Sequence, residues 1–194
     1  MTRFDPSSAL LVVDVQNDFA DPRGSLYVRG GDDVVPVIAR EIAAARAAGG
    51  MVVYSQDWHP PRTPHFRSSG GIWPDHCVRD TWGAAFHPDL PVDGAVVRKG
   101  VDGSDGYSAF SVRDPESGTT SATSLGSLLR GASIDRVVIV GLATDYCVVE
   151  TALDARRLGF DAEVLTEAIR AVDLAPGDGD AALDRARGAG VVVD

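Results

Sequence analysis

Short apolar runs alternate along this chain with segments of helical period, and this alternation constrains the fold more than any other feature. The runs lie at 8–15, 51–56, 95–99, 136–142 and 162–166, with a final VVV at 191–193, and the helical patterns lie at 32–48, 124–129, 145–158 and 180–188. Continuous apolar runs of this length are typical of strands covered on both faces. We therefore predict an α/β fold, a doubly wound, mainly parallel sheet with helices on both faces.

The length of the chain fits one domain spanning 1–194, because 194 residues are enough to bury a full core. No internal repeat or low-complexity linker divides it. The softest stretch, DPESGTTSATS at 114–124, is interpreted as a loop that leads into a helix.

The charge balance excludes two classes of partner. The chain has 18 basic and 28 acidic side chains, a net charge of −10. Such a surface repels phosphate backbones and anionic lipid, so we expect neither nucleic acid nor a membrane as partner. The apolar run near the N-terminus is far too short to span a membrane, and no export signal precedes it, so we expect a cytoplasmic protein. In that compartment Cys77 and Cys147 are expected to be free thiols.

Four reactive side chains fall at or just beyond strand ends. Asp14 ends the first predicted strand, Asp57 follows the second, Lys99 ends the third, and Cys147 comes shortly after Leu142. Each alone has an ordinary structural interpretation, as a helix cap, a surface lysine or a packed thiol. Because ligands bind outside the carboxyl ends of parallel strands, the four together predict a site at that edge of the sheet.

Cys147 has the position of a nucleophile. It follows a strand and a turn of small residues and opens an amphipathic helix, with Thr144 or Asp145 as the expected N-cap. The free N–H groups of a first helical turn favour a thiolate and stabilise an oxyanion. Asp14 is the candidate acceptor for the thiol proton, and Lys99 the candidate partner of that carboxylate.

A second cluster lies in the stretch QDWHPPRTPHFRSSGGIWPDHC, which holds three of the four histidines. Asp57, His59, His65 and His76 offer one carboxylate and three imidazoles, ligands that suit Zn²⁺, Fe²⁺ or Mn²⁺. The prolines at 60, 61, 64 and 74 predict a rigid loop. The alternative is a polar loop with incidental histidines.

Three neighbouring residues are given structural interpretations. Cys77 adjoins His76 in the sequence, so its side chain is expected to point elsewhere. Asp75 either supports a metal ligand or closes a turn. His87 is expected to orient a loop.

Taken in order, these residues resemble the nicotinamidase branch of the isochorismatase-like cysteine hydrolases. The resemblance extends from about residue 8 to residue 173. It rests on LLVVDVQNDF (10–19), DWHPPRTPHF (57–66), WPDHCV (73–78), FHPDL (86–90), RKG (98–100), DGYSAF (105–110) and GLATDYCVVETALDA (141–155).

The resemblance implies a catalytic triad of Asp14, Lys99 and Cys147. Cys147 would attack a carboxamide carbon, form a thioester and release ammonia, and water would then hydrolyse the thioester. The backbone N–H groups of Ala143 and Cys147 would form the oxyanion hole, in a turn at Ala143 and Thr144 that contains a cis peptide bond.

The resemblance also implies the metal and the substrate. Asp57, His59 and His76 match metal ligands, and His65 matches a histidine that only some members use. The metal, expected to be zinc with iron or manganese as alternatives, would hold the ring nitrogen of a pyridine carboxamide. The positions that match the pyridine pocket are Phe19, Trp73 and Tyr107.

The sequence departs from the family pattern after His76. Members commonly have a glycine where this chain has Asp80, in HCVRDT. Aspartate tolerates the left-handed backbone that such a glycine serves.

The implied activity is hydrolysis of nicotinamide, and of pyrazinamide, to the acid and ammonia, by a possible homo-oligomer. Three alternatives stay open. One is another amidase or an isochorismatase-type hydrolase acting on a carbamoyl, ureido or enol-ether substrate. The second is a metallohydrolase that uses metal-bound water. The third is a metal-stabilised scaffold without catalysis, against which the triad residues argue.

Overall fold

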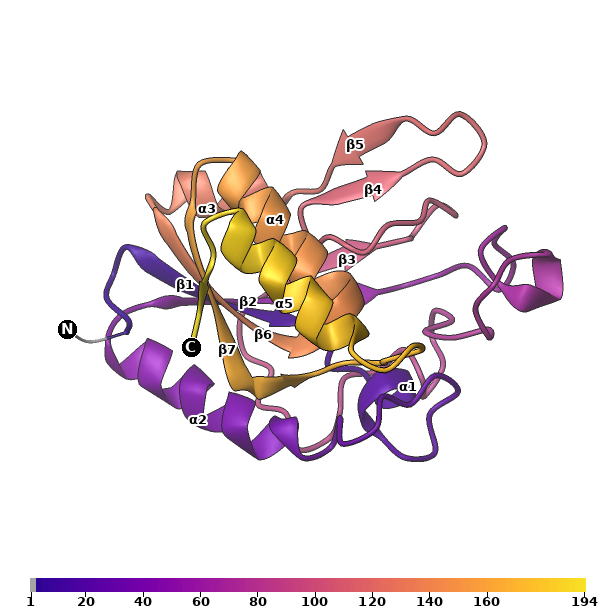
Figure 1. The fold of residues 1–194 in the computed structure, drawn as a ribbon, viewed down its shortest axis with the longest axis horizontal. Helices are drawn as coiled ribbons and strands as arrows, with labels where there is room; N and C mark the ends of the chain where they lie inside the picture. The colour runs from indigo at the N-terminus through magenta and orange to yellow at the C-terminus, as the bar shows by residue number, and fades with distance from the viewer. Residues whose placement is uncertain (1–2) are drawn as a thin grey trace.

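Six parallel strands form the central sheet of the computed structural model, which describes residues 3–194 (Figure 1). Their order across the sheet is β3-β2-β1-β6-β7-β8, and every pairing is parallel. The bounds are β1 Ser8–Val13, β2 Met51–Asp57, β3 Ala95–Lys99, β6 Arg136–Leu142, β7 Asp161–Arg170 and β8 Val192–Val193. The mainly parallel sheet predicted from the apolar runs is confirmed.

Helices cover both faces of this sheet, as predicted. α1 (Asn17–Ala20) and α2 (Val34–Ala47) pack on one face, and α3 (Leu125–Gly131), α4 (Val149–Arg157) and α5 (Asp178–Gly188) pack on the other (Figure 1). Alternate residues of each strand serve the two faces. In β1, Leu10 and Val12 pack with α2, whereas Leu11 and Val13 pack with α3 and α4. Burial on both faces explains why the strand is apolar throughout.

The strand order places a crevice between β1 and β6. From β1 the chain moves outward to β2 and β3 on one side, and from β6 it moves outward to β7 and β8 on the other. The carboxyl ends of the two central strands therefore flank the point at which the winding reverses, where open α/β sheets bind ligands. Asp14 follows β1 directly, and Cys147 lies in the turn after β6.

Three elements differ from the sequence prediction. The stretch 114–124 is not only a loop, since β5 (Thr120–Ala122) pairs with β4 (Ser111–Arg113) in a hairpin that projects from the body (Figure 1). All of β5 is exposed, so it has no apolar alternation to detect. α1 has only four residues, too few to show a helical period. β7 extends four residues beyond its predicted end at 166, because it pairs with β6 again after a shift in register.

Among residues 3–194 no helix combines the length and the apolar character needed to cross a membrane.

Candidate active site

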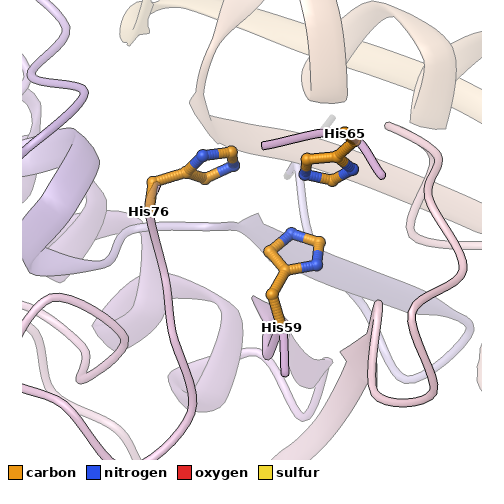
Figure 2. Close-up of side chains that lie close together, drawn as sticks. All are labelled: His59, His65 and His76. Carbon is orange, nitrogen blue, oxygen red and sulfur yellow. The ribbon is translucent and has the colours of Figure 1, made fainter. Parts of the chain in front are cut away.

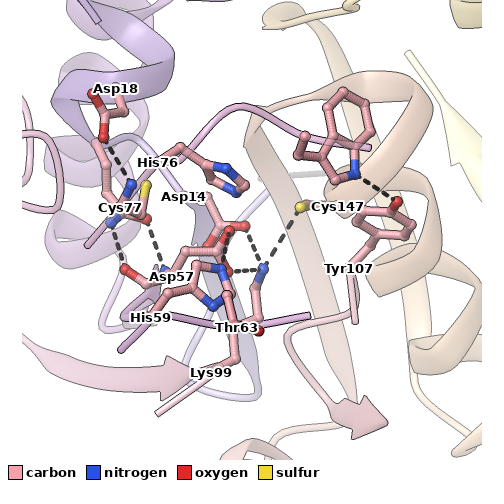
Figure 3. Close-up of polar contacts among 12 residues, drawn as sticks. Asp14, Asp18, Asp57, His59, Thr63, His76, Cys77, Lys99, Tyr107 and Cys147 are labelled. Atoms are coloured by element: carbon pink, nitrogen blue, oxygen red, sulfur yellow. Dashed lines mark hydrogen bonds and ion pairs between the residues drawn. The ribbon is translucent and has the colours of Figure 1, made fainter. Parts of the chain in front are cut away.

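The ammonium group of Lys99 lies at the centre of the predicted site. Its Nζ atom is 2.9 Å from Oδ2 of Asp14, 2.5 Å from Oδ1 of Asp57 and 3.6 Å from Sγ of Cys147 (Figure 3). These side chains come from the ends of β1, β2, β3 and the turn after β6. The structure thus brings together all four residues that the sheet-edge argument selected.

The two carboxylates beside Lys99 differ in basicity. Burial raises the pKa of Asp14, and the attraction of Lys99 only partly opposes this effect. Burial also acts to raise the pKa of Asp57, but there the charge of Lys99 and the neighbouring histidines outweigh it and hold the pKa well below its ordinary value. Paired groups whose pKa values are pushed apart take different roles in catalysis. Asp14 is the member suited to accept a proton.

Lys99 itself stays charged. Burial acts to lower its pKa, but Asp14 and Asp57 raise it well above the ordinary value of a lysine. Only 2% of the residue is exposed, so its charge acts in a low-dielectric environment. The hydroxyl of Ser55, a residue not selected from the sequence, donates a hydrogen bond of 2.7 Å to Oδ1 of Asp14. Together these contacts fix the orientation of the carboxylate.

The turn that carries Cys147 is wound differently from the predicted helix start. Residues Thr144–Val148 form one π-helical turn before α4, and the N-cap is Ala143, with no side-chain cap hydrogen bond. The predicted cap is therefore wrong. The carboxylate of Asp145 instead accepts hydrogen bonds of 2.9 Å from the N–H groups of Val172 and Asp173. Because this carboxylate is engaged across the fold, it is not free to cap its own helix.

The cis peptide bond joins Leu142 to Ala143, one bond before the Ala143–Thr144 turn to which the family resemblance assigns it. The thiol of Cys147 is buried in the turn, and burial raises its pKa well above the ordinary value, with Asp14 and Asp57 adding to the effect and Lys99 opposing it. This differs from the thiolate expected of a helix start. A protonated thiol needs a base at the moment of attack. Asp14, whose pKa is raised, is the candidate for that base.

Three histidines converge beside this site (Figure 2). One potential ligand atom from each of His59, His65 and His76 lies within 4.8 Å of the other two. Burial lowers the pKa of His76 and brings that of His65 to about 4, so both rings carry a free lone pair at neutral pH. The Nδ1–H group of His76 donates to the carbonyl of Pro74 at 2.7 Å, which leaves Nε2 for a ligand.

The donor set fits a divalent metal ion. Both ring nitrogens of His59 and Nε2 of His65 are buried and find no hydrogen-bond partner within residues 3–194. Such orphaned nitrogens are costly unless they coordinate something, and neutral imidazoles suit zinc, iron or manganese. Oδ2 of Asp57 lies 3.7 Å from Nε2 of His59, while its Oδ1 contacts Lys99. Asp57 as a fourth ligand stays a prediction.

A cavity of about 420 Å³ connects the thiol to the histidines. The three aromatic residues selected from the sequence, Phe19, Trp73 and Tyr107, line it. The ring centroid of Phe19 is 5.5 Å from that of His76. Nε1 of Trp73 donates a hydrogen bond of 3.2 Å to Oη of Tyr107. Cavities with apolar walls and a few convergent polar groups are typical of small-molecule sites.

Several wall residues were not selected from the sequence, and four of them are Leu26, Val28, Tyr146 and Val172. The ring of Tyr146 lies 5.0 Å from that of Trp73 and 5.1 Å from that of Tyr107. Its place directly before Cys147 is the signal that would have found it. The other three have no comparable local signal.

Residues that received structural interpretations lie outside the thiol and histidine clusters. Cys77 is a fully buried free thiol. Cys147 is also free, so the prediction of two free thiols is confirmed. Asp75 accepts a hydrogen bond from Ser68 at 2.7 Å on an exposed part of the loop. His87 accepts the N–H group of Asp89 at 3.3 Å and so orders its own loop. Asp80 has φ +64°, the left-handed conformation expected of a residue in a glycine's place.

The ring of His59 lies against Gly100, the residue that follows Lys99 in the sequence. A Cβ atom at Gly100 would lie 2.4 Å from Nδ1 of His59, and the glycine has φ +76°. We expect Gly100→Ala to push the ring away from the other histidines and weaken zinc binding about 10–100-fold, as lost ligand support does. Competition with a chromophoric chelator measures this. Gly103→Ala is the control, because Gly103 also has a positive φ, +89°, but open space around it. Equal zinc affinity in the two variants would contradict the role of this contact.

Comparison with known proteins identifies the family. The isochorismatase-domain family model matches residues 8–194. The chain belongs to the isochorismatase family. Within it, the nicotinamidase of Escherichia coli (strain K12) is 41% identical over 191 residues, covering 89% of this chain and 87% of that protein.

Two solved structures of isochorismatase-fold proteins extend the comparison. Pyrazinamidase of Pyrococcus horikoshii in complex with zinc matches with a TM-score of 0.87 and 38% identity, over 97% of this chain and 99% of that one. PnC1 from L. infantum in complex with nicotinate matches with a TM-score of 0.88 and 36% identity, over 97% and 92%. The isochorismatase fold inferred from the motifs is thereby confirmed.

Proposed function

We propose that this isochorismatase-family protein is a metal-dependent nicotinamidase that also hydrolyses pyrazinamide. The observation that carries the proposal is that one cavity presents the Cys147 thiol, joined to Asp14 through Lys99, and three clustered imidazoles. The similarity to the E. coli nicotinamidase and to a nicotinate complex supports a pyridine carboxamide as substrate. The products are nicotinate and ammonia.

In the first half-reaction, Sγ of Cys147 attacks the carboxamide carbon while Asp14 takes the thiol proton. Lys99 stays protonated and balances the negative charge that passes through the site. The N–H groups of Ala143 and Cys147 are the proposed donors to the oxyanion. When the C–N bond breaks, Asp14 returns the proton to the leaving nitrogen, ammonia departs, and the acyl group remains on sulfur as a thioester.

In the second half-reaction, Asp14 takes a proton from water, whose oxygen attacks the thioester carbon. The C–S bond then breaks, Asp14 returns its proton to sulfur, and the carboxylic acid leaves as its anion after releasing the second proton of the water to solvent. The same carboxylate therefore acts as base and acid in both halves. Its raised pKa suits this alternation, since proton transfer is most efficient when the pKa lies near the working pH.

Asp57, His59, His65 and His76 are the proposed holders of one divalent metal ion. The zinc complex of the similar pyrazinamidase supports zinc, with iron or manganese as alternatives. When bound, the ion supplies a Lewis-acid site for the pyridine nitrogen. Phe19, Trp73 and Tyr107 are the proposed walls around the ring, and they exclude water from it.

The test compares nicotinamide with benzamide, which has the same carboxamide but no ring nitrogen. We expect the zinc-loaded protein to release ammonia from nicotinamide at least about 100-fold faster, because benzamide loses a polar contact that the site is built to make. After treatment with a chelator, the rate on nicotinamide should fall to that on benzamide, and added zinc should restore it. Equal rates on both amides would contradict recognition of the ring by the metal site.

A further inference from the structure

The proposed metal ligands belong to a segment with little regular structure of its own. Between Asp57 and Cys77 the only helix or strand is the single 3₁₀ turn Arg67–Ser69. His59 is anchored by backbone pairing, because its N–H group donates to Cys77 and its carbonyl accepts from Arg79. Asp57 ends β2 and pairs with Lys99 of β3, and both ends of the segment, Asp57 and the residues around His76, receive further contacts from elsewhere in the fold. Two side chains directly after Asp14 contact those ends.

Gln16 holds the first end. It is fully buried, and its Oε1 accepts the N–H group of Asp57 at 2.8 Å. Its Nε2 donates to the carbonyl of Asp57 at 2.7 Å and to that of Ala84 at 2.9 Å. One amide side chain thus satisfies both backbone groups of Asp57, as a neighbouring strand would. Any rotation of the Asp57 backbone would break both bonds.

Asp18 holds the second end. Its Oδ2 accepts the N–H group of Cys77 at 2.7 Å (Figure 3). Its Oδ1 accepts the N–H group of Ser25 at 3.0 Å. Cys77 directly follows His76 and has φ +45°, a conformation that a non-glycine residue adopts only when its surroundings impose it. The bond to Asp18 holds the N–H group of this residue, and the N–H group of His59 holds its carbonyl.

The backbone of Gly83 lies against the carboxylate of Asp18 and keeps it from moving away from Cys77. A Cβ atom at Gly83 would lie 2.0 Å from Oδ2 and 2.5 Å from Oδ1 of Asp18. The N–H group of Asp18 also donates to the carbonyl of Gly83 at 3.0 Å. The carboxylate is therefore confined between the loop at Gly83 and the backbone of Cys77. It has two charge-assisted hydrogen bonds to N–H groups, which are stronger than neutral ones.

We propose that Gln16 and Asp18 are positioning residues that set the metal ligands at a fixed distance from the nucleophile's base. This inference rests on the proposed function. Asp14 and both positioning residues lie within five consecutive residues, so one rigid segment joins the two halves of the site. A substrate must span the distance from the metal ligands to Sγ of Cys147, and the segment sets the position of the metal ligands at one end of that distance. Gln16 and Asp18 thereby contribute to the selection of pyridine carboxamides.

The first test uses the unaltered protein. Because the positioning contacts consist of protein alone, the amide of Cys77 should exchange its hydrogen as slowly in the metal-free protein as in the zinc-loaded one. Hydrogen–deuterium exchange measured on a peptide that contains Cys77 gives this comparison. Rapid exchange without zinc would mean that the metal orders the segment, and it would overturn the proposal.

The second test uses Asp18→Asn. An amide has only one acceptor oxygen, so its NH₂ group must face the N–H group of either Cys77 or Ser25. We expect zinc affinity to fall about 10–100-fold, the range for lost support of metal ligands. The visible absorption spectrum of the Co²⁺-loaded protein should change in shape, because the ligand geometry changes. The matched control is Asp21→Asn: both aspartates are 8% exposed, but Asp21 bonds to Arg23. The control should keep the affinity and spectrum of the unaltered protein.

Selectivity separates positioning from general damage. A variant with fewer folded molecules loses activity on nicotinamide and benzamide equally, so the ratio of their kcat/KM values stays constant. We expect Asp18→Asn to lower that ratio at least about tenfold, since ring recognition suffers more than amide chemistry. An unchanged ratio together with unchanged zinc affinity would overturn the proposal.

Gly83→Ala is the second variant, in case Asp18→Asn fails to fold. It leaves the carboxylate in place chemically but displaces it by contact, so it should also weaken zinc binding and change the cobalt spectrum. Normal zinc binding by a folded Gly83→Ala protein would count against the role of Asp18. Zinc affinity and the cobalt spectrum are measured without any amide. A protein inactive on nicotinamide that still shows both effects would refute the proposed function and keep the positioning role.

Discussion

The Cys147→Ala protein releases ammonia from nicotinamide at least about 10⁴-fold more slowly than the unaltered protein, if the thiol forms the thioester. The reason is that Cys147 lines the cavity and lies 3.6 Å from Nζ of Lys99. The hydroxyl of Ser55 also reaches Asp14, but Ser55 does not line the cavity in which the substrate would bind. The histidine cluster does not include Cys147, so zinc content should stay unchanged. Steady-state ammonia release and metal analysis of the same preparation measure the two quantities.

Retained turnover would contradict the thioester route. In that case water bound to the metal is the remaining nucleophile, and the protein would be a metallohydrolase in which Cys147 only fills space. Loss of zinc together with activity would show instead that the substitution damages the site as a whole. The predicted combination, zinc retained and turnover lost, separates these outcomes.

Lys99→Met is expected to have the largest effect on stability. The substitution keeps an unbranched side chain one atom shorter than lysine but leaves the carboxylates of Asp14 and Asp57 buried without the cation that they share. Breaking a buried ion pair from one side costs about 3–5 kcal/mol. Urea unfolding of the metal-free proteins at neutral pH should show a decrease of this size in the free energy of unfolding, and activity should be lost because Asp14 no longer has its partner.

The double variant Asp14→Asn/Lys99→Met provides the control. It removes one of the two uncompensated charges, so part of the lost stability should return, whereas activity should not. A Lys99→Met protein as stable as the unaltered one would show that the carboxylates do not depend on this lysine. A double variant that recovers activity would remove Asp14 and Lys99 from the mechanism.

The sheet could be predicted from the sequence because its strands are buried on both faces. The run of β6 is apolar on both faces of the sheet. The helices beside it in the sequence instead show apolar residues at a helical period, so strands and helices can be told apart. The hairpin β4–β5 could not be predicted, because its stability comes from backbone pairing between short polar strands. The π-helical turn of Thr144–Val148 also gave no signal, since its winding depends on where Asp145 finds partners in the folded chain.

The reactive residues could be predicted because parallel strands deliver their carboxyl ends to one edge. That rule alone was enough to select Asp14 and Lys99. The family motifs were needed to select the aromatic residues Phe19, Trp73 and Tyr107. The protonation of Cys147 could not be predicted, because it depends on burial and on two carboxylates that are distant in sequence. The hydrogen bond between Asp18 and Cys77 could not be predicted either, because it forms only when α1 folds against the segment that carries the histidines.

Hydrolysis of a pyridine carboxamide is the activity that the proposed function assigns to this protein. The most direct test incubates the zinc-loaded protein with nicotinamide and quantifies nicotinate and ammonia in the same samples over time. The structure and the family relationship predict that both products appear at equal rates, catalytically and in proportion to enzyme. Absence of both products from protein shown to contain zinc would contradict the claim.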